Sequence, residues 1–316
     1  MPLIFKDPRF QLVAVVVLAV VVGLGEHRIN PYYQGVAIDI GIAIILAVSL
    51  NLINGHTGQF SLGHAGFMSV GAYSSAMMTL AFQKNIGADL LPWLFLPALL
   101  VGGLVAALVG LLVGVPSLRL RGDYLAIVTL GFGEIIRVIF QNVEAVGGAS
   151  GLSGIPKLNG LAWTFGLAAV TVYVVGCVVK STYGRGFIAV HDDEVAASSI
   201  GLDPTRYKVT AFVIGAFFAG IAGGLFAHKM TSISPQGFDF MKSFEVVVIV
   251  ILGGMGRTAG VIVAAVVLTL VNEQLRSAAE FRMILYALLI ILLMIARPQG
   301  LFYFERKKRP NTVAKS

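Results

Sequence analysis

The feature that most constrains this sequence is a series of apolar runs, each close to the length that an α-helix needs to cross a lipid bilayer. A hydrocarbon core about 30 Å thick is spanned by about 20 helical residues. With glycine, proline and charged residues taken as segment ends, the sequence predicts eight to ten membrane segments. The candidates are 11–25, 34–54, 62–82, 92–115, 123–141, 161–180, 207–228, 243–253, 259–275 and 282–296. Segment 243–253 is short enough to be a re-entrant half-helix.

Composition agrees with lipid, and not water, as the solvent for most of the surface. The 316 residues are 57% hydrophobic and 12% charged, whereas a soluble domain is about half apolar and about a quarter charged. We expect an all-α, polytopic transmembrane helical bundle that forms one domain over 1–316. The net charge of +7 does not indicate nucleic acid as a partner, because the Lys and Arg residues lie between the apolar runs and not on one polar face.

The distribution of basic residues predicts which loops face the cytoplasm. Basic residues concentrate in short cytoplasmic loops. With the N-terminus placed inside, 15 of the 23 Lys and Arg residues fall on the cytoplasmic side, seven fall outside, and Arg137 lies within the membrane. Both termini are therefore predicted to be cytoplasmic, as are the 181–208 loop and a basic tail at 297–316. Lys6 and Arg9 before 11–25 would suit a signal peptide, but no small-residue cleavage site follows, so we expect a retained first helix.

Small residues at four-residue spacing predict close packing between some of these helices. Ala216, Gly220 and Gly224 form one such row, and Gly110 and Gly114 another. Small residues let helix backbones approach each other in a membrane. This pattern supports a tight bundle and carries no information on a substrate.

Two stretches interrupt the apolar pattern with glycine and polar residues, one at 51–64 and the other at 253–260. Backbone that leaves the helix at membrane depth must be buried in protein or line a wet cavity, and paired interruptions in two halves of a chain are typical of a transport path. Glycine-rich cytoplasmic turns are the other interpretation, and both stay open. The candidate path residues are Asn54, Gln59, Ser61, His64, Gly253, Gly254 and Gly256. We expect no metal site, because His56 and His64 have no carboxylate or Cys at ligand spacing.

Charged residues inside the predicted segments are few. Glu134 and Arg137 are three residues apart on one predicted helix, so the two side chains can form an intramembrane ion pair. A structural pair and a gate or path contact are both open interpretations. Asp39 and Glu245 lie near segment ends, and the sequence assigns them no role beyond hydration.

The 181–208 loop is the most informative polar stretch. Asp192, Asp193 and Glu194 place negative charge where a short helix would begin, and Gly201 stands where that helix would end. Asp203 and Pro204 suit the N-cap and the first position of the next membrane helix. A short amphipathic helix on the cytoplasmic side, between two membrane helices, is a suitable contact for a soluble partner.

The 181–208 loop also carries a resemblance to a family. EVAASSIG at 194–201 is similar to the E-x-A-A-x-x-x-G core of the cytoplasmic coupling loop of bacterial ABC importer permeases. GHTGQFSLGHAGF at 55–67, Gly71-Ala72-Tyr73, LRGDYLAIVTLGFGEIIR at 120–137, LGGMG at 252–256 and RPQGLF at 297–302 resemble the LivM-type branched-chain amino-acid permeases, in matching order. In that family the loop docks on an ATP-binding subunit. The resemblance therefore implies a coupling role for Gly184, Arg185, Asp193, Glu194, Ala196, Ala197 and Gly201.

The resemblance also implies the rest of an importer. It implies a homologous LivH-like permease subunit, two cytoplasmic ATPase subunits and an extracytoplasmic substrate-binding protein, in the inner membrane of a bacterium. The sequence has no G-x-x-x-x-G-K-[ST], so ATP would be bound by the partner subunits, and no catalytic motif indicates an enzyme. We expect no cofactor on this chain. The alternative is a secondary transporter driven by an ion gradient, with Glu134 and Arg137 as the coupling site. The sequence leaves the substrate open among branched-chain and other amino acids, urea or amides, and aromatic acids.

Overall fold

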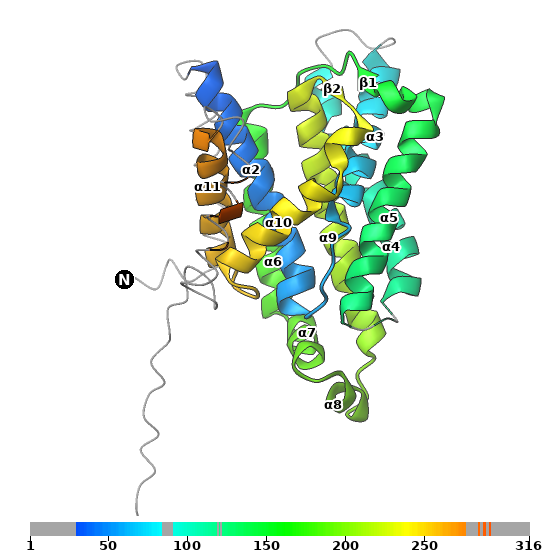
Figure 1. Cartoon of the computed structure of the whole chain (residues 1–316), viewed down its shortest axis with the longest axis vertical. Coiled ribbons are helices and arrows are strands. Elements are labelled where there is room, and N and C mark those ends of the chain that lie inside the picture. The colour runs from blue at the N-terminus through cyan, green and yellow to red at the C-terminus, as the bar shows by residue number, and fades with distance from the viewer. Residues whose placement is uncertain are drawn as a thin grey trace, which may run out of the picture.

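The computed structural model of the chain describes residues 30–83, 91–118, 120, 122–275 and the isolated positions 284, 287, 288 and 291. Over these residues the protein is a bundle of α-helices, as predicted (Figure 1). The longer elements are α2 (Pro31–Asn51), α3 (His64–Gln83), α4 (Leu91–Ser117), α5 (Asp123–Asn142), α6 (Leu161–Lys180), α9 (Pro204–Met230), α10 (Phe240–Gly253) and α11 (Thr258–Gln274). The shorter ones are the π-helical turn η3 (Leu52–His56), η5 (Glu144–Val146), η6 (Gly148–Ser150), β1 (Leu152–Ser153), α7 (Thr182–Asp192), α8 (Glu194–Ser199), β2 (Ser232–Ile233) and η7 (Pro235–Phe238).

The membrane segments agree with the sequence-based prediction wherever the structure describes them. Five described helices are long and apolar enough to cross a membrane: Pro31–His56, Trp93–Ser117, Tyr124–Asn142, Leu161–Lys180 and Pro204–Met230. The segment predicted at 161–180 coincides with α6, and the ends of the other described helices lie within three residues of the predicted ends, with η3 counted as part of the first. The predicted segment 11–25, most of 282–296 and the basic tail lie outside the described residues.

The helix α10 is shorter than a full membrane crossing. Its 14 residues rise about 21 Å at about 1.5 Å per residue, less than the roughly 30 Å of a hydrocarbon core. Figure 1 shows α10, in yellow, running obliquely across the bundle before the chain turns back into α11. This geometry matches the half-helix interpretation of 243–253.

The core of the bundle is formed where α3, α4 and α9 approach one another closely. A side chain at Gly71 would clash with the backbone of Gly220, and a side chain at Gly110 would meet the Cβ of Ala216 at 2.6 Å. The aromatic rings of Phe67 and Phe212 pack edge to face beside these contacts, with centroids 5.3 Å apart. The predicted small-residue packing is confirmed, because these backbones approach at positions where there is no room for a side chain.

The two ends of the bundle differ in structure. At one end β1 pairs antiparallel with β2, with Leu152 opposite Ile233, so the α5–α6 and α9–α10 connections are joined. At the other end lie α7 and α8 (Figure 1). The separation matches the predicted orientation, in which these connections lie on opposite sides of the membrane.

Two residues that the sequence assigns to hydration have protein partners instead. Asp39 on α2 forms an ion pair with Lys229 at the end of α9. Glu245 on α10 pairs with Lys242 at 2.9 Å and accepts a hydrogen bond from Asn272 Nδ2 on α11 at 2.9 Å. Each carboxylate therefore joins two different helices, α2 to α9 and α10 to α11, which the position of a residue near a segment end does not reveal.

Replacing Gly71 with alanine should loosen the core. A Cβ there forces α3 and α9 apart, and overpacking of this kind destabilises a fold by about 1–3 kcal/mol. The matched control is Gly176→Ala on α6, where nothing lies within 4 Å of the added Cβ. We expect Gly71→Ala to lower the midpoint of thermal unfolding in detergent by several degrees and Gly176→Ala to leave it unchanged. Equal midpoints for the two variants would contradict the packing.

Candidate functional site

The first candidate feature is a break in the helix between α2 and α3, formed by η3 and the extended residues 57–63; we call residues 52–63 the helix break. The helix α2 passes into the π-helical turn Leu52–His56, a rare geometry that is frequent at functional sites. Thr57 Oγ1 then donates to Ile53 O at 2.7 Å, and Gly58 adopts a φ of 68°. Glycine takes this left-handed conformation without steric cost, so the chain can turn out of the helix here.

Backbone N–H groups of the helix break and of the start of α3 are satisfied by side chains of the break itself, α5 and α10. Ser61 N donates to Asn54 Oδ1 at 3.2 Å, and Leu62 N donates to Thr129 Oγ1 on α5 at 3.0 Å. At the start of α3, Ala65 N donates to Ser243 Oγ on α10 at 2.9 Å. These partners replace the intrahelical bonds that lipid cannot supply. The break is therefore a built element and not a frayed helix end.

Successive side chains of residues 57–61 point to opposite sides, as in a strand. Thr57, Gln59 and Ser61 are at most 2% exposed, whereas Phe60 is 37% exposed and Gly58 is also exposed. The predicted path residues Asn54, Gln59, Ser61 and His64 are all buried inside the chain, and His64 Nε2 lies 2.9 Å from Ser49 Oγ. Their role in transport stays a prediction.

Phe60 and Leu62 of the helix break were not among the path residues predicted from the sequence. The signal that could have found them is the strict alternation of polar and non-polar side chains from Thr57 to Leu62, which is typical of an extended segment with two different faces.

The second interruption packs directly on the first. The chain turns between α10 and α11 with positive φ at Gly254 (91°) and Gly256 (78°). Gly256 N donates to Asn51 Oδ1 at 2.9 Å, across 205 residues of sequence. A side chain at Gly55 would clash with the backbone of Gly256. Of the predicted path residues, Gly256 therefore lies against the end of α2 and joins the two interruptions, whereas Gly253 packs against Gly260 and Val261 of α11.

The second candidate feature is the 181–208 loop, which folds as predicted around its caps. Asp193 is the N-cap of α8, where its Oδ1 accepts from Val195 N at 2.8 Å and Ala196 N at 3.0 Å. Gly201 ends this part with a φ of 87°. Asp203 then caps α9, ahead of Pro204. The prediction missed α7, whose N-cap is Ser181.

The remaining loop residues to which the sequence gave a coupling role lie as follows. Gly184 is buried against the end of α6, where a side chain would clash with the backbone of Val179. Arg185 is exposed, with Nη2 3.3 Å from Thr182 Oγ1. On α8, Ala196 is exposed and Ala197 is 3% exposed. The loop thus presents some of these residues to solvent and uses others for packing.

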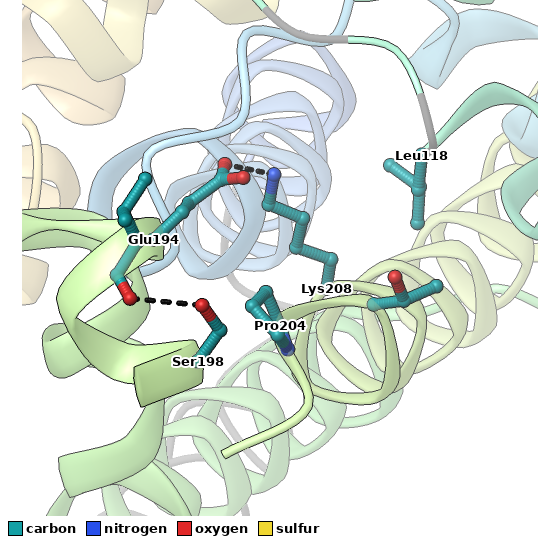
Figure 2. A pocket seen from close by; sticks show the side chains of 7 residues that line it. Leu118, Glu194, Ser198, Pro204 and Lys208 are labelled. Atoms are coloured by element: carbon teal, nitrogen blue, oxygen red, sulfur yellow. Dashed lines mark hydrogen bonds and ion pairs between the residues drawn. The ribbon is translucent and has the colours of Figure 1, made fainter. Parts of the chain in front are cut away.

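A cleft of about 240 Å³ lies between α8 and the start of α9 (Figure 2). Figure 2 shows Glu194 and Lys208 facing each other across one side of it, joined as an ion pair. The side chain of Lys208 is only 7% exposed. The lining of the cleft is completed by Leu118, Val195, Ser198, Pro204 and Thr205. The ion pair therefore fastens α8 to the base of a membrane-crossing helix.

The loop and the helix break are in contact. Gln59 Nε2 donates to Lys208 O at 3.3 Å and to Thr57 Oγ1 at 2.8 Å. A side chain at Gly58 would clash with the imidazole of His191 on α7. The route from Glu194 through Lys208 to Gln59 thus connects the exposed helix α8 to the break within the bundle.

The predicted ion pair within α5 is confirmed. Arg137 Nη2 lies 2.6 Å and Nε 2.7 Å from Glu134 Oε2. Glu134 also lines a small groove between the helix break, α5 and the start of α10. The pair is near the middle of α5 and 27% to 33% exposed, so the rest of the chain does not enclose it.

Membrane-crossing helices, a satisfied break at membrane depth and a charged groove together define a polytopic transport protein. Residues 32–296 match the family described as "Branched-chain amino acid transport system / permease component". The chain belongs to this family of permease components.

Three relatives illustrate the range of the family. The high-affinity branched-chain amino acid transport system permease protein LivM of Escherichia coli (strain K12) is 40% identical over 84% of this chain and 68% of its own length. LivH of the same organism is 25% identical over 87% of this chain and 95% of its own. The guanosine ABC transporter permease protein NupQ of Bacillus subtilis (strain 168) is 25% identical over 62% and 68%. No solved structure matches the chain.

Removing the Asn51 side chain should loosen the junction of the two interruptions. In Asn51→Ala the partly buried Gly256 N–H loses its acceptor, which costs about 1–3 kcal/mol. We expect the amide of Gly256 to exchange hydrogen about tenfold to a hundredfold faster, measured by mass spectrometry of peptides that cover 250–260. The control is Asn142→Ala at the exposed end of α5, which should leave this exchange unchanged. Slow exchange in both variants would show that the bond is dispensable.

Proposed function

We propose that this chain is one permease subunit of an ATP-driven importer, and that it carries branched-chain or related amino acids across the inner membrane of a bacterium. The family match and the 40% identity to LivM support the cargo class. The more distant NupQ is named for guanosine, so related folds serve more than one cargo. In this proposal ATP is bound by separate subunits, and this chain needs no cofactor of its own.

The proposal assigns this chain four kinds of partner. A homologous LivH-like permease completes the path, and the similarity of this chain to LivH over 87% of its length is what two related halves of one pore require. Two cytoplasmic ATPases drive the cycle, and an extracytoplasmic binding protein delivers the amino acid. Membrane lipid covers the apolar outer faces of helices such as α4, where Leu104 and Leu112 are 62% and 67% exposed.

The observation that carries the proposal is the route from Glu194 through Lys208 to Gln59. A load applied to α8 is passed by the ion pair to the base of α9 and by the Gln59 bond to the helix break. The break in turn holds the turn between α10 and α11 through Asn51. Closure of the ATPases would thus shift the elements that border the path. Coupling of this kind requires contacts that differ between the two states, and the proposal assigns this role to the contacts along the route.

The exposed surface of the 181–208 loop suits a protein partner. Val195 and Ile200 are 62% and 75% exposed, at the end of the bundle that carries polar caps and not at an apolar membrane face. Exposed apolar residues rimmed by charge mark interaction sites. We therefore assign the docking of an ATPase to α7 and α8, with Gly184, Arg185, Asp193, Glu194, Ala196, Ala197 and Gly201 as its coupling residues.

The decisive test is uptake by proteoliposomes that contain both permeases, the ATPases and the binding protein. We expect accumulation of radiolabelled leucine only when ATP is enclosed on the ATPase side. Uptake by the purified chain alone, driven by a proton or sodium gradient without ATP, would refute the proposal and favour a secondary transporter.

Reversing the charge of Glu194 should uncouple the complex. In Glu194→Lys two cations face each other at the partly buried Lys208, and breaking a pair of this kind costs about 3–5 kcal/mol. We expect loss of ATPase co-purification and at least a tenfold fall in uptake. The matched control is Glu144→Lys on the opposite, strand-bearing end, where the residue is also exposed. Unchanged association and uptake in Glu194→Lys would argue against the coupling role.

The predicted orientation can be tested by cysteine labelling. Cys177 is the single native cysteine, so Cys177→Ala provides a background for Ser199→Cys and Lys157→Cys, both at exposed positions. A maleimide that cannot cross the membrane should label only Lys157→Cys in intact spheroplasts and Ser199→Cys only after lysis. Labelling of Ser199→Cys in intact spheroplasts would place the loop outside and overturn the coupling proposal.

A further inference from the structure

Glu134, the carboxylate of the Glu134–Arg137 pair, lines a small groove beside the helix break. The outward face of the helix break forms one side of the groove, through Leu62, and the start of α10 forms another, through Phe240. Gly133 and Glu134 of α5 line it as well, and the lining is completed by Ala65, Gly66, Leu130, Phe238, Asp239 and Ser243. The enclosed volume is only about 10 Å³, about the space of one water molecule. The groove of this chain alone is therefore too small for an amino acid.

The ion pair has unused binding capacity. Both donors of Arg137 reach the same oxygen, Oε2 of Glu134. Within the part of the chain that the structure describes, no other hydrogen bond or ion pair is made by either side chain. The second carboxylate oxygen and the other guanidinium N–H groups are left for a ligand, because a carboxylate has about four acceptor sites and a guanidinium five donors.

A structural role does not account for this pair. An ion pair three residues apart on one helix stabilises the helix by only about 0.2–0.5 kcal/mol. Two other ion-paired carboxylates also contact a second helix: Asp39 pairs with Lys229, and Glu245 also binds Asn272. Glu134 and Arg137 lie on the same helix and join nothing else. Charged side chains inside a membrane are expensive and mark substrate pathways.

The chemistry of the pair matches the backbone of an amino acid. A free amino acid carries an ammonium and a carboxylate on adjacent carbons, and so presents opposite charges at short distance. Arginine binds carboxylates with a planar fork of donors, and the Glu134 carboxylate can accept from an ammonium. The apolar side chains of Leu62 and Phe240, which line the groove with Glu134, offer a surface for an aliphatic side chain.

We propose that Glu134 and Arg137 form a zwitterion-binding site on the wall of the path, where Glu134 receives the α-ammonium and Arg137 the α-carboxylate of the passing amino acid. The inference rests on the proposed function, because it takes an amino acid as the cargo. Between transport events the two side chains neutralise each other. When the amino acid binds, its ammonium takes the place of Arg137 beside Glu134, and its carboxylate takes the place of Glu134 beside Arg137. No bond to the side chain of the cargo is required, so the site accepts amino acids as a class.

The test uses the complete importer in proteoliposomes with leucine-loaded binding protein at saturation. The variant Glu134→Gln, Arg137→Gln removes both charges and keeps polar side chains that can bond to each other. The matched control is Lys242→Gln, Glu245→Gln, another pair three residues apart and similarly exposed. Hydrogen bonds to charged groups contribute about 1.5–3 kcal/mol, so we expect maximal uptake to fall about tenfold or more in the first variant. Hydrolysis of ATP should continue, and the control should keep uptake within about twofold.

Each other outcome overturns the proposal. Uptake within twofold of the wild type in the Glu134→Gln, Arg137→Gln variant would show a structural pair. Equal losses of uptake and hydrolysis in this variant and the control would show a role in assembly. If the double variant does not assemble, the single variant Glu134→Gln, which keeps an acceptor for Arg137, is measured instead. Uptake within twofold of the wild type would then overturn the proposal. A failure of the proposed function is seen separately, as wild-type proteoliposomes that do not take up leucine with ATP.

Discussion

The structure depends on one constraint: backbone that leaves a helix within lipid must find its hydrogen-bond partners in the protein. Residues 57–63 leave the helix, and backbone N–H groups there donate to Asn54 and to Thr129 on α5, while Ala65 N at the start of α3 donates to Ser243 on α10. An unsatisfied peptide group in the hydrocarbon region would cost several kcal/mol. The positions of α5 and α10 beside the break follow from this requirement, and so does the groove between them.

The break is also the place where distant parts of the chain meet. Asn51 holds the turn between α10 and α11, Gln59 holds the base of α9, and Gly58 leaves just enough room for His191 of α7. Each single bond contributes only about 1 kcal/mol. A junction made of several weak bonds is easier to rearrange than a continuous hydrophobic core, as the proposed coupling through α8 requires.

The two faces of the break divide its roles between structure and contact. Thr57 and Gln59 turn inward and bond to backbone groups, while Phe60 is exposed and Leu62 lines the groove with Glu134. The sequence alone favoured polar side chains as the candidates for a path, because polar groups in a membrane segment usually mark one. In the structure Asn54 and Gln59 bond to backbone groups instead, and the charged pair on α5 stays partly exposed.

The sequence by itself determined membrane residence, the helix segments and the caps of the 181–208 loop. Transfer of apolar runs to lipid and the capping by Asp193 and Asp203 act over a few neighbouring residues, so local patterns contain them. Only the tertiary structure decided that Gly256 donates to Asn51, that Gln59 reaches Lys208, and which side of residues 57–62 faces the core. These depend on short-range bonds between groups up to 205 residues apart in the chain. No local pattern encodes them, because hydrogen bonds act over a few ångströms and become specific only once the helices have packed.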